Sequence, residues 1–198
     1  MNKKLQNTKT LQNLVNAFAG ECQACSRYWM MAEVARDKGL NELAKFIKEI
    51  STNEYYHSKR IYEFIEESDD KVIDGLKVCS NYPFKEKMDD FVEAFNHASF
   101  DEGEEAKEIY PSFARIAKEE GFDDIANFFT NLIQVETCHH LAMKEFYNEL
   151  KSDTLYVRTP AIKWKCAKCG YEVTSKTPPE ICPICKAPKG DIMIEMPE

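Results

Sequence analysis

Two short motifs in the first 150 residues pair a carboxylate with an imidazole at helical spacing. They are Glu54-x-x-His57 and Glu136-x-x-His139. Residues three apart share one face of an α-helix, so each motif presents both side chains to the same neighbours. Glutamate can bridge two cations while histidine binds one terminally, and carboxylate oxygen with some imidazole suits iron or manganese. The two motifs therefore predict a dinuclear metal site.

Two further segments bring glutamates to the same place. Apolar residues with steps of three and four form seams through four segments, and each seam turns to Glu or His near its middle. The first seam carries Glu21 and the third carries Glu102 and Glu105, beyond which we expect it to continue through Ile109 and Ile116. A buried, unpaired carboxylate costs several kcal/mol. Four such interruptions therefore favour one shared polar layer.

The seams also indicate the elements that position these residues. Short turns at 37–39 and 120–121 separate the first helix from the second and the third from the fourth, which requires antiparallel neighbours. The longer stretch 68–84 joins the second helix to the third, as a crossover would. At a rise of about 1.5 Å per residue, the Glu and His residues of each antiparallel pair meet at the same level. We expect an antiparallel four-helix bundle, with a kink about a turn before Pro111.

A second metal signal lies near the end of the chain. Cys166-x-x-Cys169 and Cys182-x-x-Cys185 form two Cys-x-x-Cys pairs about a dozen residues apart. Such pairs build two knuckles around one tetrahedral ion, and Gly170 permits the tight turn that the first knuckle needs. The pattern predicts a tetrathiolate site and leaves iron and structural zinc open.

Composition limits the class of protein. The chain has 198 residues, of which 43% are hydrophobic and 30% charged, so it can bury a core and is not intrinsically disordered. A net charge of −8 without a basic cluster makes nucleic acid a poor partner. No apolar stretch is long enough for a membrane span. Eight cysteines without an export signal indicate thiols or metal ligands in a reducing compartment, and hence a cytoplasmic protein.

Proline divides the chain, because six of its eight prolines follow residue 159. We expect residues 1–151 to form the helical bundle, 152–162 a linker, and 163–198 a small tail domain of strands and turns.

Together these motifs resemble the rubrerythrin family over the whole chain. The motifs that carry the resemblance are Ala17–Glu21, Glu54-x-x-His57, Glu102-x-x-Glu105 followed by Tyr110–Ala117, Glu136-x-x-His139, and the four tail cysteines. The resemblance implies a mainly α fold: a ferritin-like di-iron bundle followed by a small rubredoxin-like domain.

The resemblance also implies a ligand set. Glu54 and Glu136 would bridge the two irons of the bundle. Glu21 would bind the first iron terminally, and Glu102 with His139 would bind the second. The four tail cysteines would hold one further iron.

Other residues acquire roles only through this likeness. In the family, the first iron exchanges a glutamate for a histidine on reduction, and these residues map to Glu105 and His57. Tyr28 and Tyr110 match tyrosines that form hydrogen bonds near the centre.

The implied activity is peroxidase chemistry, in which hydrogen peroxide is reduced to water and oxidative stress is relieved. Electrons would pass through the tail iron from rubredoxin or an external NAD(P)H-dependent reductase, because the chain has no Gly-x-Gly-x-x-Gly nucleotide-binding motif. A homodimer, head-to-tail or helix-swapped, is also implied.

Three other functions remain open at this stage. Iron oxidation and storage would use the same bundle, although shell-forming storage proteins generally lack a tetrathiolate module. A non-catalytic metal protein would carry zinc in the tail. Oxidase chemistry with dioxygen is a nearer alternative.

Four cysteines lie outside the tail site. Cys22, Cys25, Cys79 and Cys138 are either small packing residues or a peroxide-sensitive thiol cluster close to the irons.

Overall fold

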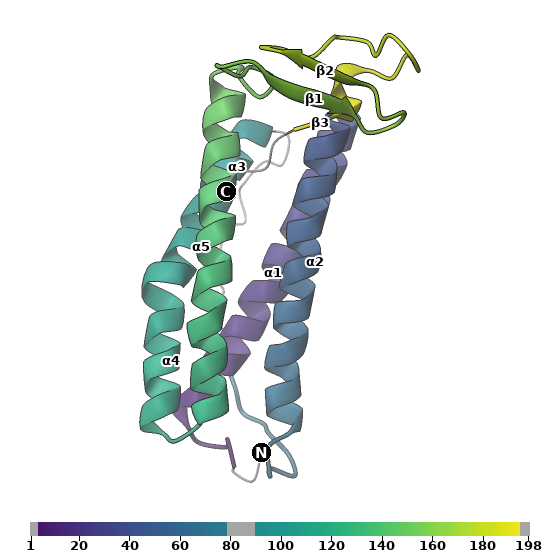
Figure 1. Ribbon diagram of the computed structural model, residues 1–198. Helices are drawn as coiled ribbons and strands as arrows, with labels where there is room; N and C mark the ends of the chain where they lie inside the picture. The colour runs from purple at the N-terminus through teal and green to yellow at the C-terminus, as the bar shows by residue number, and fades with distance from the viewer. Residues whose placement is uncertain (1–3, 79–89, 195–198) are drawn as a thin grey trace.

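The structure, a computed structural model, describes residues 4–78 and 90–194 (Figure 1). Long helices form the body of the molecule: α1 (Lys9–Asp37), α2 (Asn41–Glu66), α3 (Phe91–Glu104), α4 (Tyr110–Glu119) and α5 (Asp123–Lys151). Helix α1 packs mainly against α2, while α5 packs against α3 and α4. The antiparallel bundle predicted from the sequence is confirmed. Within the described ranges, no helix is both long and apolar enough to cross a membrane.

Short turns produce the antiparallel neighbours. Gly39 and Gly121 have φ of 75° and 79°, and they lie in the predicted turns between α1 and α2 and between α4 and α5. At the other end of α1, the Thr8 side chain accepts a hydrogen bond from the Leu11 N–H at 3.0 Å and caps the helix.

The bundle has an apolar core at each end and a polar layer between them. One cluster includes Leu43, Phe95 and Phe146, and the other includes Leu14 and Phe129. The buried acidic residues of the helices are Glu21, Glu54, Glu102 and Glu136. Apolar packing at both ends therefore holds the carboxylates of the middle layer in place.

The third helix is interrupted where the sequence predicts a kink. A π-helical turn, η1 (Glu105–Ile109), separates α3 from α4, and Pro111 follows it at the start of α4. A π-turn inserts one extra residue into a helix. Beyond Gly103 the buried residues of this stretch are Ala106, Tyr110 and Ala117, whereas Ile109 and Ile116 are only half-buried. The predicted continuation of this seam was thus wrong by one residue.

The tail folds as a three-stranded antiparallel sheet in the order β2-β1-β3. Its strands are β1 (Ile162–Cys166), β2 (Glu172–Ser175) and β3 (Ile192–Met193), and a 3₁₀ turn, η2 (Lys189–Asp191), precedes β3. Trp164, Cys166, Cys182 and Ile192 form its small core.

The tail rests on the end of its own bundle (Figure 1). Asn41 Nδ2 donates a hydrogen bond to Asp191 Oδ1 at 2.9 Å. Gly190 lies so close to the α1–α2 turn that a Cβ there would fall 1.6 Å from the Gly39 carbonyl oxygen. Leu155 from the connecting segment and Ile194 from the tail both pack into the bundle core. Segments before and after the sheet in the sequence therefore hold the tail against the bundle.

Candidate metal centres

Four side chains meet beside His57 in the middle of the bundle. Glu21, Glu54, His57 and Glu136 each offer one atom, and these atoms all lie within 4.8 Å of one another. His57 Nδ1 is 2.9 Å from Glu54 Oε2, 3.2 Å from Glu136 Oε1 and 3.3 Å from Glu21 Oε2. We call this the first group.

A second group forms beside His139. Glu54, Glu102, Glu136 and His139 also converge within 4.8 Å, and all four are buried. His139 Nδ1 is 2.8 Å from Glu136 Oε2, 3.0 Å from Glu54 Oε1 and 3.5 Å from Glu102 Oε2. The rings of His57 and His139 are stacked with centroids 6.0 Å apart.

Glu54 and Glu136 belong to both groups. Each turns one carboxylate oxygen toward His57 and the other toward His139. A carboxylate placed between two cations in this way can bridge them. Glu21 faces only the first group and Glu102 only the second. The bridging and terminal roles that the family resemblance implies for these residues stay a prediction.

The buried donor atoms do not satisfy one another. Within the described part of the chain, Glu54 Oε1, Glu102 Oε2, both Glu136 oxygens and His139 Nδ1 form no hydrogen bond, although they lie close together. A buried polar atom without a partner costs about 1–3 kcal/mol. Atoms that converge without bonding to each other are suited to cations placed between them. The donor set therefore fits two iron ions.

Burial controls the protonation of these side chains. It raises the pKa of Glu21 to about 8 and that of Glu136 to about 7, although the facing histidines act in the opposite direction. Burial alone lowers the pKa of His57, but the carboxylates of Glu136, Glu21 and Glu54 raise it to about 12. The protein without metal therefore stores protons in this layer, and a bound cation would displace them.

A tyrosine supports each terminal glutamate. The Tyr110 hydroxyl donates a hydrogen bond to Glu21 Oε1, and the Tyr28 hydroxyl donates one to Glu102 Oε1. In both cases the accepting oxygen is the one that faces away from the neighbouring histidine. Both tyrosines are 1% exposed, so the two hydrogen bonds are shielded from water and fix the glutamate rotamers.

Glu105 lies outside both groups. It is half-buried on the π-turn, and its Oε1 lies against Gly20 of α1, at 3.6 Å from where a Cβ would stand. Burial and then the charge of Glu102 raise the pKa of its carboxyl well above the usual range. Thus the structure brings His57 and not Glu105 into the first group.

A cavity of about 450 Å³ opens beside this glutamate, between α1 and the π-turn. Its lining includes Gly20 and Tyr110, which border Glu21, and the acidic side chains of Asp101, Glu104 and Glu105. The cavity therefore borders Gly20 and Tyr110, which adjoin Glu21 of the first group.

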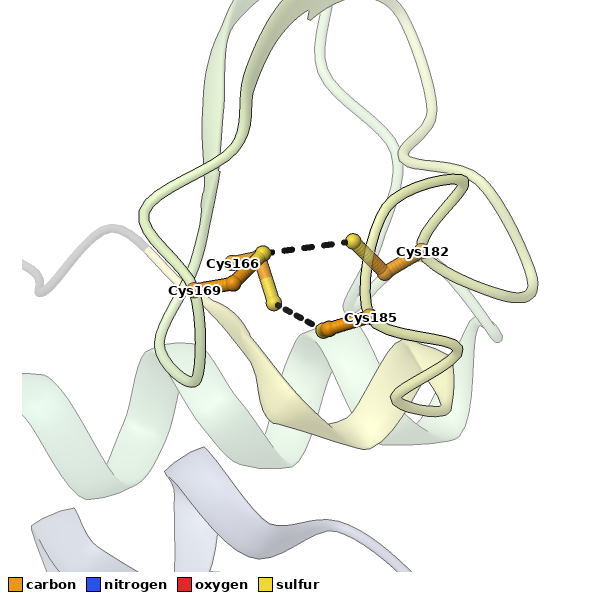
Figure 2. A group of neighbouring side chains, drawn as sticks. All are labelled: Cys166, Cys169, Cys182 and Cys185. Carbon is orange, nitrogen blue, oxygen red and sulfur yellow. Dashed lines mark hydrogen bonds between the residues drawn. The ribbon is translucent and has the colours of Figure 1, made fainter.

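The four tail cysteines form a separate cluster at the end of the bundle (Figure 2). Their sulfurs lie within 4.8 Å of one another, with Cys166 Sγ 3.7 Å from Cys185 Sγ and Cys169 Sγ 3.6 Å from Cys182 Sγ. A tetrahedral ion with metal–sulfur bonds of about 2.3 Å requires sulfurs about 3.8 Å apart. The cluster therefore fits one tetrathiolate iron.

The two knuckles share one backbone feature. Gly170 and Lys186 each follow the second cysteine of a pair, and their φ angles are 77° and 64°. The sequence indicates this turn only at the glycine. Backbone N–H groups of Cys185 and Ile184 lower the pKa of the Cys182 thiol to about 6. The turns therefore direct N–H groups toward sulfur and favour thiolate.

The remaining thiols take different positions. Cys22 and Cys25 are half-buried on α1, Cys138 is exposed on α5, and Cys79 lies outside the described residues. Burial raises the pKa of the Cys22 thiol. His140 stands outside both groups, with its Nδ1 2.6 Å from the Ser99 carbonyl oxygen. Sequence reasoning missed Asn53, whose Nδ2 is 3.4 Å from His139 Nε2, because no spacing rule singles it out.

The chain is similar to known proteins. The profile of the rubrerythrin family matches residues 12–150, and that of the rubrerythrin rubredoxin-like domain matches residues 164–191. Rubrerythrin of Porphyromonas gingivalis is 35% identical over 189 residues, which cover 96% of this chain and 91% of that protein. Rubrerythrin of Nitratidesulfovibrio vulgaris is 34% identical and covers 94% of each chain.

Solved structures agree with this assignment. Nigerythrin in a mixed-valent state has a TM-score of 0.59 at 25% identity, covering 98% of this chain and 92% of its own. Rhodobacter capsulatus bacterioferritin has a TM-score of 0.58 at 23% identity and covers 77% of this chain and 89% of its own, which shows the shared bundle fold. Since the family profile spans the whole bundle and the relatives cover nearly the full length, the chain belongs to the rubrerythrin family.

Proposed function

We propose that this chain reduces hydrogen peroxide to water at the bundle centre in the cytoplasm, with electrons supplied through the tail iron. The observation that carries the proposal is the presence of two different clusters in one chain: carboxylates and histidines that fit two irons, and four thiols that fit one. The relatives named rubrerythrin align with both parts of this chain over nearly their full length. A tetrathiolate iron is suited to one-electron transfer, which storage of iron alone does not require.

The residues around the centre have distinct tasks. When bound, the two irons supply the Lewis acidity and the two electrons that cleavage of the O–O bond requires. Glu54 and Glu136 would hold the metals at a fixed separation, since each reaches both groups. The hydroxyls of Tyr28 and Tyr110 keep the two terminal glutamates oriented. His57 and the nearby Glu105 are alternative ligands for the first position.

The cavity beside Glu105 supports a small, polar substrate. Its lining includes Gly20 and Tyr110, which adjoin Glu21 of the first group. Polar side chains in the lining can exchange hydrogen bonds with peroxide and with the product water. The buried core clusters on either side of the layer leave the rest of the centre dry.

The position of the tail favours electron transfer between two copies of the chain. The tail contacts Asn41, which lies 13 residues before Glu54 on the same helix. At about 1.5 Å per residue, this places a chain's own tail about 20 Å from its centre along the bundle. A head-to-tail homodimer would shorten the path by presenting the partner's tail. Rubredoxin or an NAD(P)H-dependent reductase would supply the electrons.

Anaerobic rapid mixing tests the proposal. Iron-loaded, fully reduced protein is mixed with one equivalent of hydrogen peroxide, and the visible absorption of the ferric tail is followed. We expect the colour to appear rapidly with peroxide and much more slowly with dioxygen. The Glu136→Gln variant, with iron confirmed in its tail, serves as the control and should stay colourless on this timescale.

Two results would contradict the proposal. One is a wild-type tail that contains iron but does not change colour with peroxide. The other is a faster response to dioxygen, which would favour oxidase chemistry. A solution mass near a dimer supports the proposed assembly, and a shell of many subunits would favour storage.

A further inference from the structure

Helix α1 carries two thiols that the dinuclear centre does not use. Cys22 directly follows Glu21, and Cys25 lies one helical turn further on. Both are half-buried, and neither belongs to the two groups described above. Residues three apart lie on the same face of a helix, and the charge of Cys25 acts on the Cys22 thiol.

Two buried serines of α2 face these thiols. Cys25 Sγ is 3.8 Å from Ser51 Oγ, and the Cys22 thiol forms a hydrogen bond with the Ser58 side chain. Ser51 and Ser58 are 1% and 5% exposed, and they flank the turn of α2 that carries Glu54. The two thiol–hydroxyl pairs therefore lie next to a turn that carries ligands.

The serine hydroxyl hydrogens are already used. Ser51 Oγ donates to the Cys25 carbonyl oxygen at 2.8 Å, and Ser58 Oγ donates to the Tyr55 carbonyl oxygen at 2.8 Å. Ser51 Oγ is therefore left to accept a hydrogen bond from the Cys25 thiol. The two contacts hold both sulfurs on the side of α1 that faces α2.

We propose that Cys22 and Cys25 form a peroxide-sensitive dithiol that closes to a disulfide within one turn of α1. The inference rests on the proposed function, because peroxide is the oxidant. One thiol sulfur attacks a peroxide oxygen, the O–O bond breaks, and a sulfenic acid and one water form. The second sulfur displaces the hydroxyl as a second water. Two thiols thus lose two electrons, and one peroxide is reduced to two waters.

Closure of this disulfide strains the turn that carries Glu21. The Cβ atoms of helical residues three positions apart are about 5–6 Å from each other, whereas the Cβ atoms of a disulfide are about 3.5–4.5 Å apart. The turn must therefore tighten by about 1–2 Å. Glu21 precedes Cys22 directly and is held by Tyr110, so this movement disturbs the first group. Oxidation at excess peroxide would loosen one metal position until a thiol reductant reopens the pair.

Peptide mapping tests the disulfide without reference to turnover. Cleavage after Lys9 and Arg27 releases residues 10–27, which contain both cysteines. Iron-loaded protein is treated with excess peroxide without a reductant, alkylated and digested. We expect the peptide to lose two hydrogen atoms and both alkylation sites, and dithiothreitol treatment before alkylation should restore them. Iron bound to the bundle should fall by one of its two ions in the closed form.

Variants make the assignment specific. Cys25→Ser should give no closed peptide and should retain both bundle irons under the same treatment. The matched control is Cys138→Ser, which removes an exposed thiol beside the ligand His139 and should close the pair as wild type does. A peptide 10–27 that stays fully alkylatable, or is oxidised only to sulfonic acid, would overturn the dithiol. Closure with unchanged iron content would overturn its effect on the first group.

The outcome remains readable if the proposed function fails. Absent colour in rapid mixing together with disulfide closure would remove the peroxidase and keep the dithiol. Rapid colour together with an unreacted peptide 10–27 would keep the peroxidase and remove the dithiol.

Discussion

The two metal regions of this chain are built in opposite ways. The bundle centre draws its ligands from α1, α2, α3 and α5, and its four glutamates are at most 1% exposed. The tail cluster draws its ligands from two local knuckles, and Cys169 and Cys185 are exposed. Helix packing fixes the first site before metal arrives. The second has only a small core around Trp164. From this difference we expect the bundle to keep its fold without metal and the tail to lose it.

Removal of metal should give the largest difference in stability between the bundle and the tail. For structural zinc in zinc-finger peptides, the free energy of metal binding is about 10–16 kcal/mol and is largely folding free energy, and we expect the same coupling in this tail. Chelation in denaturant-free buffer should therefore abolish protection of the β1 and β2 amides from hydrogen exchange, while amides of α2 and α5 stay protected. Equal loss of protection in both regions would break the comparison.

Tyr28 and Tyr110 should each affect the metal affinity of one position in the bundle centre. Loss of a hydrogen bond to a ligand typically lowers metal affinity about 10–100-fold. We expect Tyr110→Phe to weaken the first position and Tyr28→Phe the second, as measured by metal titration followed by spectroscopy. Tyr62→Phe, at a 49% exposed position of α2, is the matched control and should bind like wild type. If each variant loses affinity equally at both metal positions, the two tyrosines do not act on separate positions.

The pH dependence of the metal-free protein is the smallest expected effect. Glu21 and Glu136 have pKa values raised from 4.5 to about 8 and about 7, and the pKa of His57 is raised from 6.5 to about 12. The folded bundle therefore binds more protons than the unfolded chain, so its stability falls as pH rises from about 5 to about 8. In the tail, the pKa of Cys182 is lowered and that of Cys169 is raised. Their contributions to the pH dependence of stability therefore have opposite signs.

Thermal unfolding of the metal-free protein between pH 5 and 8 measures this effect. A loss of about 1 kcal/mol corresponds to a fall in Tm of about 2–4 °C. Added iron should reverse the trend, because metal displaces the stored protons more easily at high pH. A Tm of the metal-free bundle that rises over this range would contradict the assigned shifts.

Most of the site could be predicted because spacing determines it. The two Glu-x-x-His motifs, Glu21 and Glu102 reach the groups that helical periodicity indicated. The Cys-x-x-Cys pairs converge for the same local reason. The motifs also indicated the family, which the comparisons confirm. The assignment of individual ligands to individual irons stays a prediction.

Other features could not be predicted, because they depend on packing between distant segments. The close approach of Gly190 to Gly39 joins two turns far apart in the sequence, and nothing in either turn marks it. The extra residue of the π-turn shifts the seam after Glu102, which a regular period of 3.6 cannot anticipate. For this reason Glu105, expected on the seam, lies at its border.

That π-turn makes the length of the chain here as important as its chemistry. Each residue of an α-helix rotates the next by about 100°. A regular helix of the same length would turn Tyr110 about 100° away from Glu21, with every ligand still present in the sequence. Deleting one residue between Glu105 and Ile109 would remove the π-turn, restore a regular helix and keep Tyr110 on the seam. A homologue with a regular helix here therefore needs one residue fewer to keep its supporting hydroxyl in place.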